Sequence, residues 1–453
     1  MTASAKRRRN RTLGAALAGI LVLGAAPALG YAGWQVLKDS KAGTAAATLK
    51  EIAFPSTRTG MIAVVDDQNL VVSLAVLVLS PSPGEGLPAV GGTLVSIPTN
   101  ANRAETATAT ALPVADSVIN AGEEGLLADV ESLMRVTINS DAVVDVDGLA
   151  ALLTPVGDLT VSLPTDVVAA TADGSTETLF VAGSAELSPA DAAKVLVARD
   201  PGQDEARRLP NIRAVWTGLA AAVGPGIGDA AALTPEVTTF DEFMTHFLAG
   251  PIQVFNDLNT LPLTGSGNPD KLDIGTLDVA SVVLLMASLA PSAMITPNPT
   301  LNFRIENALT QADIDAAGLV GMTRADVTRN LISRLLFLQG NVVSVSSAVY
   351  TLESKVPPDT TVVFSPGGLE PAELEAITDS LGELEFDSPP FVFPLVDIVI
   401  VVGRSFLTDM ANVQAILDTS TTEGTTDGST PTSDTTGDSG ANPPASSTDT
   451  VTT

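Results

Sequence analysis

The chain has 453 residues, which is long enough for two or three folded domains. Its 52 acidic residues against 23 Lys and Arg give a formal net charge of −29, and this sign argues against binding nucleic acid, whose phosphates attract cationic surfaces. The sequence has no cysteine, which excludes disulfides, thiol nucleophiles and Cys-ligated zinc. A single histidine, His246, leaves little basis for His-ligated metal centres or a Ser-His-Asp triad, and a packed or surface role is expected for it.

The N-terminus predicts a membrane segment. Five cations between Lys6 and Arg11 come directly before residues 12–37, which carry no charge. About 20 apolar residues suffice to span a membrane, and a cationic flank stays in the cytoplasm. Residues 1–38 are therefore predicted to be a cytoplasmic basic stub and a single transmembrane anchor, which places the body outside the cell membrane. A cleaved signal peptide is the alternative, because residues 26–28 are small and resemble a cleavage region.

After a spacer at residues 39–58, the pattern alternates between strands and helices. Apolar runs predict strands at 61–65, 70–79, 92–98, 142–146 and 159–163, and helical spacing predicts helices at 126–134 and 149–153. Ser188 and Pro189 are typical of a helix N-cap and first turn. This alternation predicts a layered α/β domain over residues 59–297.

A second, smaller α/β domain is predicted over residues 300–408. Asp273 and Asp278 interrupt the apolar run 272–289, which favours a buried helix over a second membrane span. Prolines at 291–299 are typical of a linker. Beyond it, the pattern predicts strands at 301–306, 342–345, 361–365 and 397–403, with helices at 324–339 and 370–381. The Ser- and Thr-rich acidic segment 419–453 is predicted to be a disordered tail.

Several short segments resemble, in order, those of the LytR-CpsA-Psr family of membrane-anchored cell-envelope proteins. They are Leu94–Asn100, Val118–Asn120, Val143–Leu153 with Gly157–Val161, and Leu196–Arg199 with Asp204–Arg207. Residues 301–407 are similar to a C-terminal domain often attached to these proteins. The resemblance implies a mixed α/β sheet with flanking helices around an apolar tunnel for a polyprenyl tail. It also implies a function, the transfer of a glycopolymer from polyprenyl pyrophosphate to peptidoglycan.

The resemblance also implies a set of site residues. Arg199, Arg207 and Arg208 would bind the pyrophosphate, with Arg207 as the catalytic residue. Asp66 and Asp67 would bind Mg²⁺. Guanidinium groups and a hard cation with oxygen ligands both suit this chemistry. Without the resemblance, the arginines read as surface cations paired with nearby acids, and the aspartates as turn residues.

The sequence departs from the family at three positions that matter for catalysis. Thr99 and Asn100 stand where the family has arginine and aspartate, and Pro210 replaces a second arginine. Loss of a transition-state arginine costs about 10³ to 10⁵ in the rate of phosphoryl transfer. Two hypotheses follow: a transferase with impaired or altered catalysis, or a non-catalytic scaffold or regulator that binds lipid carrier or wall polymer.

Overall fold

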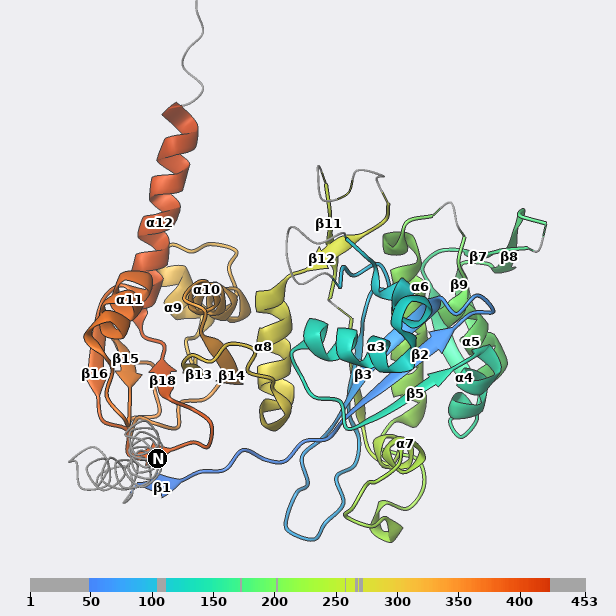
Figure 1. The fold of residues 1–453 in the computed structure, drawn as a ribbon, viewed down its shortest axis with the longest axis horizontal. Coiled ribbons are helices and arrows are strands. Elements are labelled where there is room, and N and C mark those ends of the chain that lie inside the picture. Colours follow the sequence, from blue (N-terminus) through green and yellow to red (C-terminus); the bar gives the residue numbers. More distant parts are fainter. Residues whose placement is uncertain are drawn as a thin grey trace, which may run out of the picture. The chain divides into compact units, whose positions relative to one another are not determined.

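The computed structural model describes residues 49–103, 111–171, 173–200, 203–256, 258–264, 268 and 272–423, with side chains to 416 (Figure 1). The predicted anchor at 1–38 and the tail beyond 423 lie outside these residues. Within the described part, no helix is both long enough and apolar enough to cross a membrane. The chain divides into two compact units, residues 1–409 and 410–453.

The first sheet is mixed, with the strand order β10-β4-β3-β2-β5. Its strands are β2 (Thr59–Val65), β3 (Val71–Leu79), β4 (Gly92–Ser96), β5 (Ser140–Val144) and β10 (Ile252–Phe255). β3 runs antiparallel to both β2 and β4, whereas β5 is parallel to β2 and β10 is parallel to β4. The sheet therefore has one edge where β2, β4, β5 and β10 all end and where β3 begins.

Helices cover both faces of this sheet (Figure 1). One apolar core takes residues from α4 (Val146–Leu153), α5 (Pro189–Val197), α6 (Glu205–Val223) and α7 (Phe240–Leu248), and the other from α3 (Ser117–Met134) and α8 (Val279–Leu289). Successive side chains of a strand point to opposite faces. Ile62 and Val64 accordingly pack in the first core, and Met61 and Ala63 in the second. The predicted mixed sheet with flanking helices is confirmed.

Short elements decorate this layered unit. They are the strand pairs β6 (Leu159–Leu163) with β9 (Gly183–Leu187), β7 (Val167–Ala170) with β8 (Thr176–Phe180), and β11 (Thr260–Pro262) with β12 (Gly275–Leu277), and the 3₁₀ turns Val114–Asp116, Ala230–Ala232 and Pro291–Ala293. The predicted cap of α5 is present, because the backbone N–H of Asp191 donates to Ser188 Oγ at 3.2 Å.

The second sheet has the order β14-β13-β18-β15-β16 and is also mixed. Its strands are β13 (Asn302–Glu306), β14 (Asn341–Ser346), β15 (Thr361–Phe364), β16 (Leu384–Asp387) and β18 (Ile398–Val401), with helices α9 (Gln311–Ala316), α10 (Arg324–Phe337) and α11 (Pro371–Leu381). α12 (Arg404–Glu423) continues past Thr419, where the tail is predicted to begin.

Two segments connect the two sheets within the first unit. α8 contributes Val282 and Met286 to a core of the first sheet, and the same helix packs against α10 and β14. The prediction of a buried helix here is confirmed for residues 279–289, while residues 275–277 form β12. Before the first sheet, β1 (Lys50–Glu51) pairs in parallel with β17 (Phe391–Val392).

Candidate functional site

The structure brings most of the predicted site residues to one edge of the first sheet. Thr99 follows β4, and Asp66 follows β2. Arg208 reaches the same edge from α6, where its guanidinium donates a hydrogen bond to the carbonyl oxygen of Val72 at the start of β3. In α/β sheets, ligands commonly bind beyond the carboxyl ends of the strands. The candidate site is therefore the edge where β2 and β4 end.

Arg208 is almost fully buried beneath this edge, with 10% of its side chain exposed. Its Nη2 also donates to the carbonyl oxygen of Leu196 at 3.1 Å, and its Nη1 lies 3.3 Å from Oε2 of Glu205. Nε and Nη1 are buried without a hydrogen-bond partner among the described residues. Burial lowers the pKa of Arg208 below its ordinary value; the Glu205 carboxylate opposes this shift, and the charge of Arg199 adds to it. Arg208 is thus a desolvated cation with unused donors.

Thr99 and Asn100 lie beside the pair Arg208 and Glu205. The backbone N–H of Thr99 donates to Oε1 of Glu205 at 3.1 Å. Asn100 Nδ2 donates to Oδ1 of Asp273 at 2.9 Å, and the other oxygen of Asp273 accepts the backbone N–H of Glu205 at 2.6 Å. Both positions are therefore held in a closed network with the first residue of α6.

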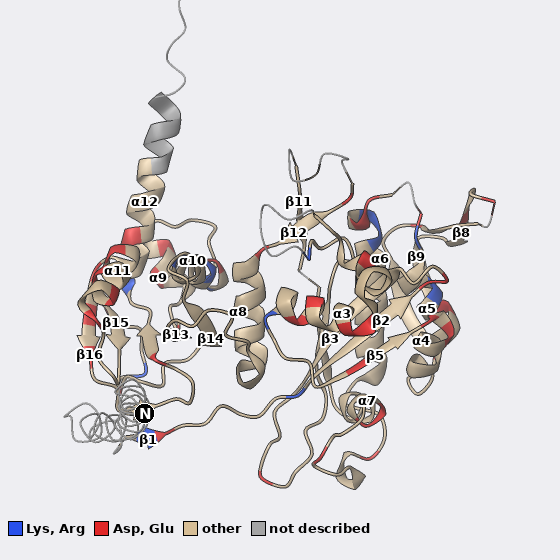
Figure 2. Cartoon of the chain, viewed as in Figure 1, with Lys and Arg blue, Asp and Glu red and all other residues tan. Residues whose placement is uncertain are grey.

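Arg199 and Arg207 are exposed, and neither side chain has a hydrogen bond or ion pair with another described residue. Arg207 and Arg208 line a hollow of about 20 Å³ together with Asp166, Asp200 and Asn211. Figure 2 shows basic residues at the start of α6 on an otherwise largely acidic chain. The structure therefore brings the three predicted arginines to one region, with two of them open to solvent.

Asp66 and Asp67 lie in the turn between β2 and β3. Oδ1 of Asp66 accepts the backbone N–H groups of Gln68 and Leu70, both at 2.9 Å, and Asp67 is exposed. These contacts make an Asx-type turn. The described residues contain no group of three or more His, Cys, Asp or Glu that could hold a metal ion. A Mg²⁺ site built by the protein alone does not fit these residues, and a role for Asp66 and Asp67 beside substrate phosphates stays a prediction.

The apolar layer beneath the site is closed. The space between the sheet and helices α4, α6 and α7 is a cavity of about 10 Å³, which is near the minimum for one water molecule. It is lined by Ile62, Leu94, Leu152, Trp216 and Phe247, among other apolar residues. This layer therefore has no open apolar tunnel of the kind that the resemblance implies. His246 is buried on α7, and its Nδ1 lies 2.8 Å from the carbonyl oxygen of Ala89, so of the two expected roles, packed or surface, the structure shows the packed one.

Two residues of the network, Glu205 and Asp273, were not among the predicted site residues. Glu205 lies between the matched positions Asp204 and Arg207, and Asp273 stands out in the sequence only because it interrupts an apolar run. One signal could have indicated Glu205. It stands three positions before Arg208, and side chains at that spacing on a helix are neighbours.

No family model matches the chain, and none of the curated proteins compared with it does. Solved structures do show similarity. TagV of B. subtilis is 15% identical, with a TM-score of 0.35 over 51% of this chain and 94% of that one. A LytR-CPS2A-psr family protein, YwtF (TagT) with bound octaprenyl pyrophosphate lipid, is 9% identical, with a TM-score of 0.32 over 49% and 84%. A putative transcription regulator from Eubacterium siraeum is 11% identical, with a TM-score of 0.35 over 49% and 86%.

These structural neighbours therefore include proteins of the family that the sequence motifs resemble. The similarity covers about half of the chain, and values this low carry no conclusion about activity.

Proposed function

We propose that this chain is a divergent cell-envelope protein of the LytR-CpsA-Psr type that binds a polyprenyl-pyrophosphate lipid carrier where α6 begins. The observation that carries this proposal is the state of Arg208, whose Nε is buried without a hydrogen-bond partner and whose Nη1 has only the ion pair with Glu205. A buried donor without a partner costs about 1–3 kcal/mol. Oxygen atoms of a pyrophosphate would satisfy such donors, and the exposed Arg199 and Arg207 would share the remaining charge.

The prenyl tail would enter the apolar layer below the arginines. That layer has only about 10 Å³ of free space, so Leu152, Trp216 and other lining side chains must move to admit it. Binding is then coupled to opening of the layer. This coupling lowers the affinity by the cost of opening, and it makes the bound state distinguishable by a change in Trp216 fluorescence.

Catalysis is proposed to be impaired. In the family, an arginine and an aspartate stand where this chain has Thr99 and Asn100, and here these residues bond to Glu205 and Asp273. A threonine supplies no positive charge for a leaving phosphate. The chain would then act as a scaffold or regulator that holds lipid-linked glycan near peptidoglycan. Active glycopolymer transfer is the second candidate function.

The double substitution Thr99→Arg with Asn100→Asp tests this assignment. If the site is otherwise intact, it should raise Mg²⁺-dependent release of phosphate from polyprenyl pyrophosphate above that of the wild type. The matched control makes the same two changes at exposed positions. These are Asn120→Asp on α3 and Thr137→Arg after α3. Robust turnover by the wild type would favour the transferase, and equal, negligible release by both variants would argue against a degenerate catalytic site.

Localisation is part of the same proposal. A single span at residues 12–37 with Arg7–Arg11 inside would leave the body outside the membrane. Protease added to intact protoplasts should then digest the body. Full protection of the residues after Lys38 would contradict this topology.

A further inference from the structure

A second pocket, with a volume of about 550 Å³, lies between α8, α10 and the end of β14. Its volume falls within the range of about 300–1,000 Å³ that small-molecule sites occupy. It shares no lining residue with the site of Arg207 and Arg208. The pocket is therefore a candidate binding site in its own right.

The pocket has an apolar wall and a polar wall. α8 supplies Leu284, Leu285 and Leu289, and the end of β10 and the loop after it add Phe255 and Leu258. α10 and the end of β14 supply the opposite side, with the hydroxyl groups of Thr323, Ser346 and Ser347. A ligand that fills this space must be apolar along one part and polar along another.

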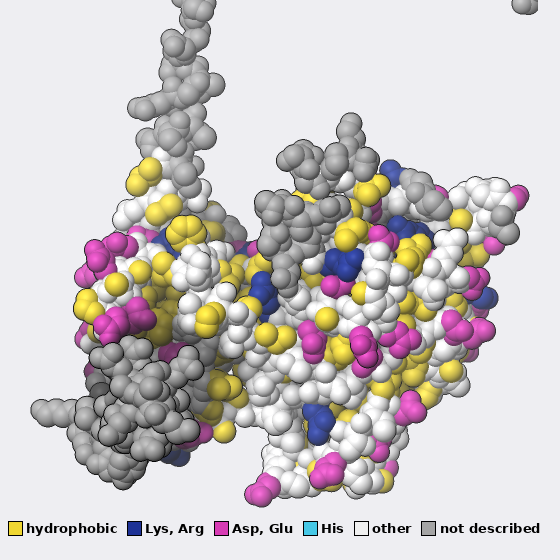
Figure 3. Space-filling view, viewed as in Figure 1, with side chains coloured by type: hydrophobic (Ala, Val, Ile, Leu, Met, Phe, Trp, Pro, Cys, Tyr) yellow, Lys and Arg dark blue, Asp and Glu magenta, His cyan; other side chains and the backbone are white. Residues whose placement is uncertain are grey.

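The polar wall is cationic. Arg324 and Arg329 line it, and no acidic residue does, although the chain carries a formal charge of −29. Figure 3 shows acidic side chains spread over the visible face, so a pocket whose charged lining residues are all cations differs from the rest of this surface. Anionic groups are therefore the polar groups that this wall favours.

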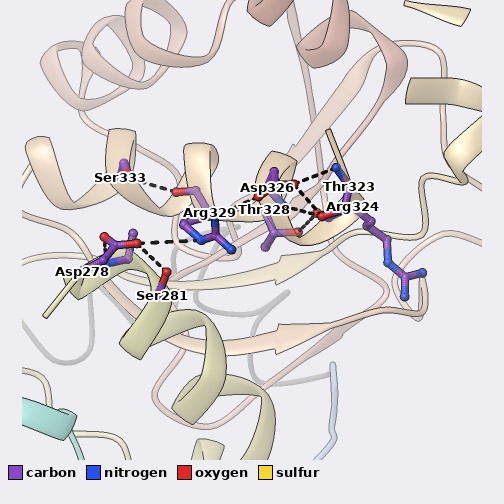
Figure 4. Close-up of polar contacts among 9 residues, drawn as sticks. Asp278, Ser281, Thr323, Arg324, Asp326, Thr328, Arg329 and Ser333 are labelled. Carbon is purple, nitrogen blue, oxygen red and sulfur yellow. Dashed lines mark hydrogen bonds and ion pairs between the residues drawn. The ribbon is translucent and has the colours of Figure 1, made fainter. Parts of the chain in front are cut away.

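The two arginines differ in how they are held. Nη1 of Arg329 donates to Oδ1 of Asp326 at 2.8 Å, and its Nε lies 3.8 Å from Oδ2 of Asp278 (Figure 4). That Nε is buried and has no hydrogen-bond partner among the described residues. Arg324 extends away from this cluster in Figure 4, and its side chain makes no hydrogen bond or ion pair with any described residue. Its guanidinium is free to bind an anion.

We propose that this pocket binds a single-chain amphiphile with an anionic head, a phosphate or a carboxylate. The chain would lie against Leu284, Leu285 and Leu289, and the head would bind Arg324. Charge complementarity excludes a cationic amphiphile, and a small hydrophilic anion would leave the leucine wall in contact with water. The inference concerns a different ligand and different residues from the lipid-carrier site.

Calorimetric titration of the full chain with dodecyl phosphate, below its micelle concentration, tests the proposal. The wild type should bind it saturably, whereas dodecyltrimethylammonium and inorganic phosphate should not bind measurably. Arg324→Glu should weaken the binding of dodecyl phosphate at least about tenfold, since charge-assisted contacts carry this much affinity. Arg58→Glu makes the same charge change on an exposed side chain that does not line the pocket, and it should leave the affinity unchanged.

A second variant tests the apolar wall without disturbing a buried residue. Ser288 lines the pocket and is exposed, so Ser288→Trp should narrow the pocket while the chain still folds. It should reduce the binding of dodecyl phosphate. Equal affinities of the Arg324→Glu and Arg58→Glu variants, or unchanged binding by Ser288→Trp, would each overturn the proposal. Absence of saturable binding by the wild type would do so as well.

Discussion

Glu205 links the residues of the candidate site to the fold. Its carboxylate is the counter-charge of Arg208, it accepts the backbone N–H of Thr99, and only 4% of its surface is exposed. The family resemblance implied that Thr99 and the arginines of α6 belong to one site. It could not predict that a carboxylate would occupy the space between them, since this depends on the close approach of α6 to the end of β4.

Glu205→Gln should destabilise the chain strongly. The substitution leaves the buried Arg208 without its counter-charge, and breaking a buried pair in this way costs about 3–5 kcal/mol. Urea unfolding followed by circular dichroism measures the change. Glu123→Gln removes an exposed carboxylate on α3 and serves as the control, with a change near zero. A loss below about 1 kcal/mol for Glu205→Gln would mean that the pair is not buried as described.

At the scale of elements, local signals predicted four of the five strands of each five-stranded sheet, and the helices α3, α4, α5, α8, α10 and α11. Examples are the β-branched runs of β2 and β3 and the Ser188 cap of α5. Strand alternation and helix capping depend on residues close together in the sequence, so the sequence is sufficient to predict them. The exposed hairpin β7–β8 and the helix α6 were missed. α6 carries Pro210 in its second turn, and packing of Leu209, Ile212 and Trp216 into the core holds the helix despite the missing backbone donor.

Asp313 in the capping box of α9 should make stability depend on pH. The hydrogen bond from Thr310 and, more weakly, the contact with Arg404 lower the pKa of Asp313. A carboxyl group with a lowered pKa in the folded state stabilises the fold above its unfolded pKa of about 3.9, and this contribution is lost as pH falls through the lowered value. Asp313→Asn should therefore be less stable than the wild type at pH 7, and the difference should shrink below about pH 4.

Thermal unfolding at pH 7 and at acidic pH measures this difference. Asp379→Asn, on an exposed position of α11, is the control and should show no such dependence. A gap between wild type and Asp313→Asn that stays constant over the whole range would contradict the assignment.

At the scale of the whole molecule, the sequence predicted two α/β sheets but not how residues 278–295 join them. α8 packs against α10 and β14, and the segment after it is tied to the first sheet's layer, because Ile295 N–H donates to the carbonyl oxygen of Arg135 at 2.9 Å. The prolines indicate a linker from local sequence alone. The packing of α8 depends on residues of both sheets, which are far apart in the sequence, so local sequence does not predict it. An independently folding second domain therefore stays a prediction.

Cleavage of the chain between the two sheets should leave both halves together. A specific protease site inserted between Pro297 and Asn298 would cut beyond the hydrogen-bonded residues 294–295. Because α8 would still pack against α10 and β14, the two fragments should elute as one species in size-exclusion chromatography under native conditions. Separate elution of the fragments would show that this packing is too weak to hold the halves.

The most direct test of the account is the affinity of the full chain for octaprenyl pyrophosphate, measured for the wild type, Arg207→Ala and Arg58→Ala. A charge-assisted contact with a phosphate is worth about 1.5–3 kcal/mol, so Arg207→Ala should weaken binding about 10- to 150-fold. Arg58→Ala removes an exposed cation outside the site and should bind as the wild type does. Saturable wild-type binding that depends on Arg207 is the predicted result, and binding that is absent or equal in all three proteins would contradict it.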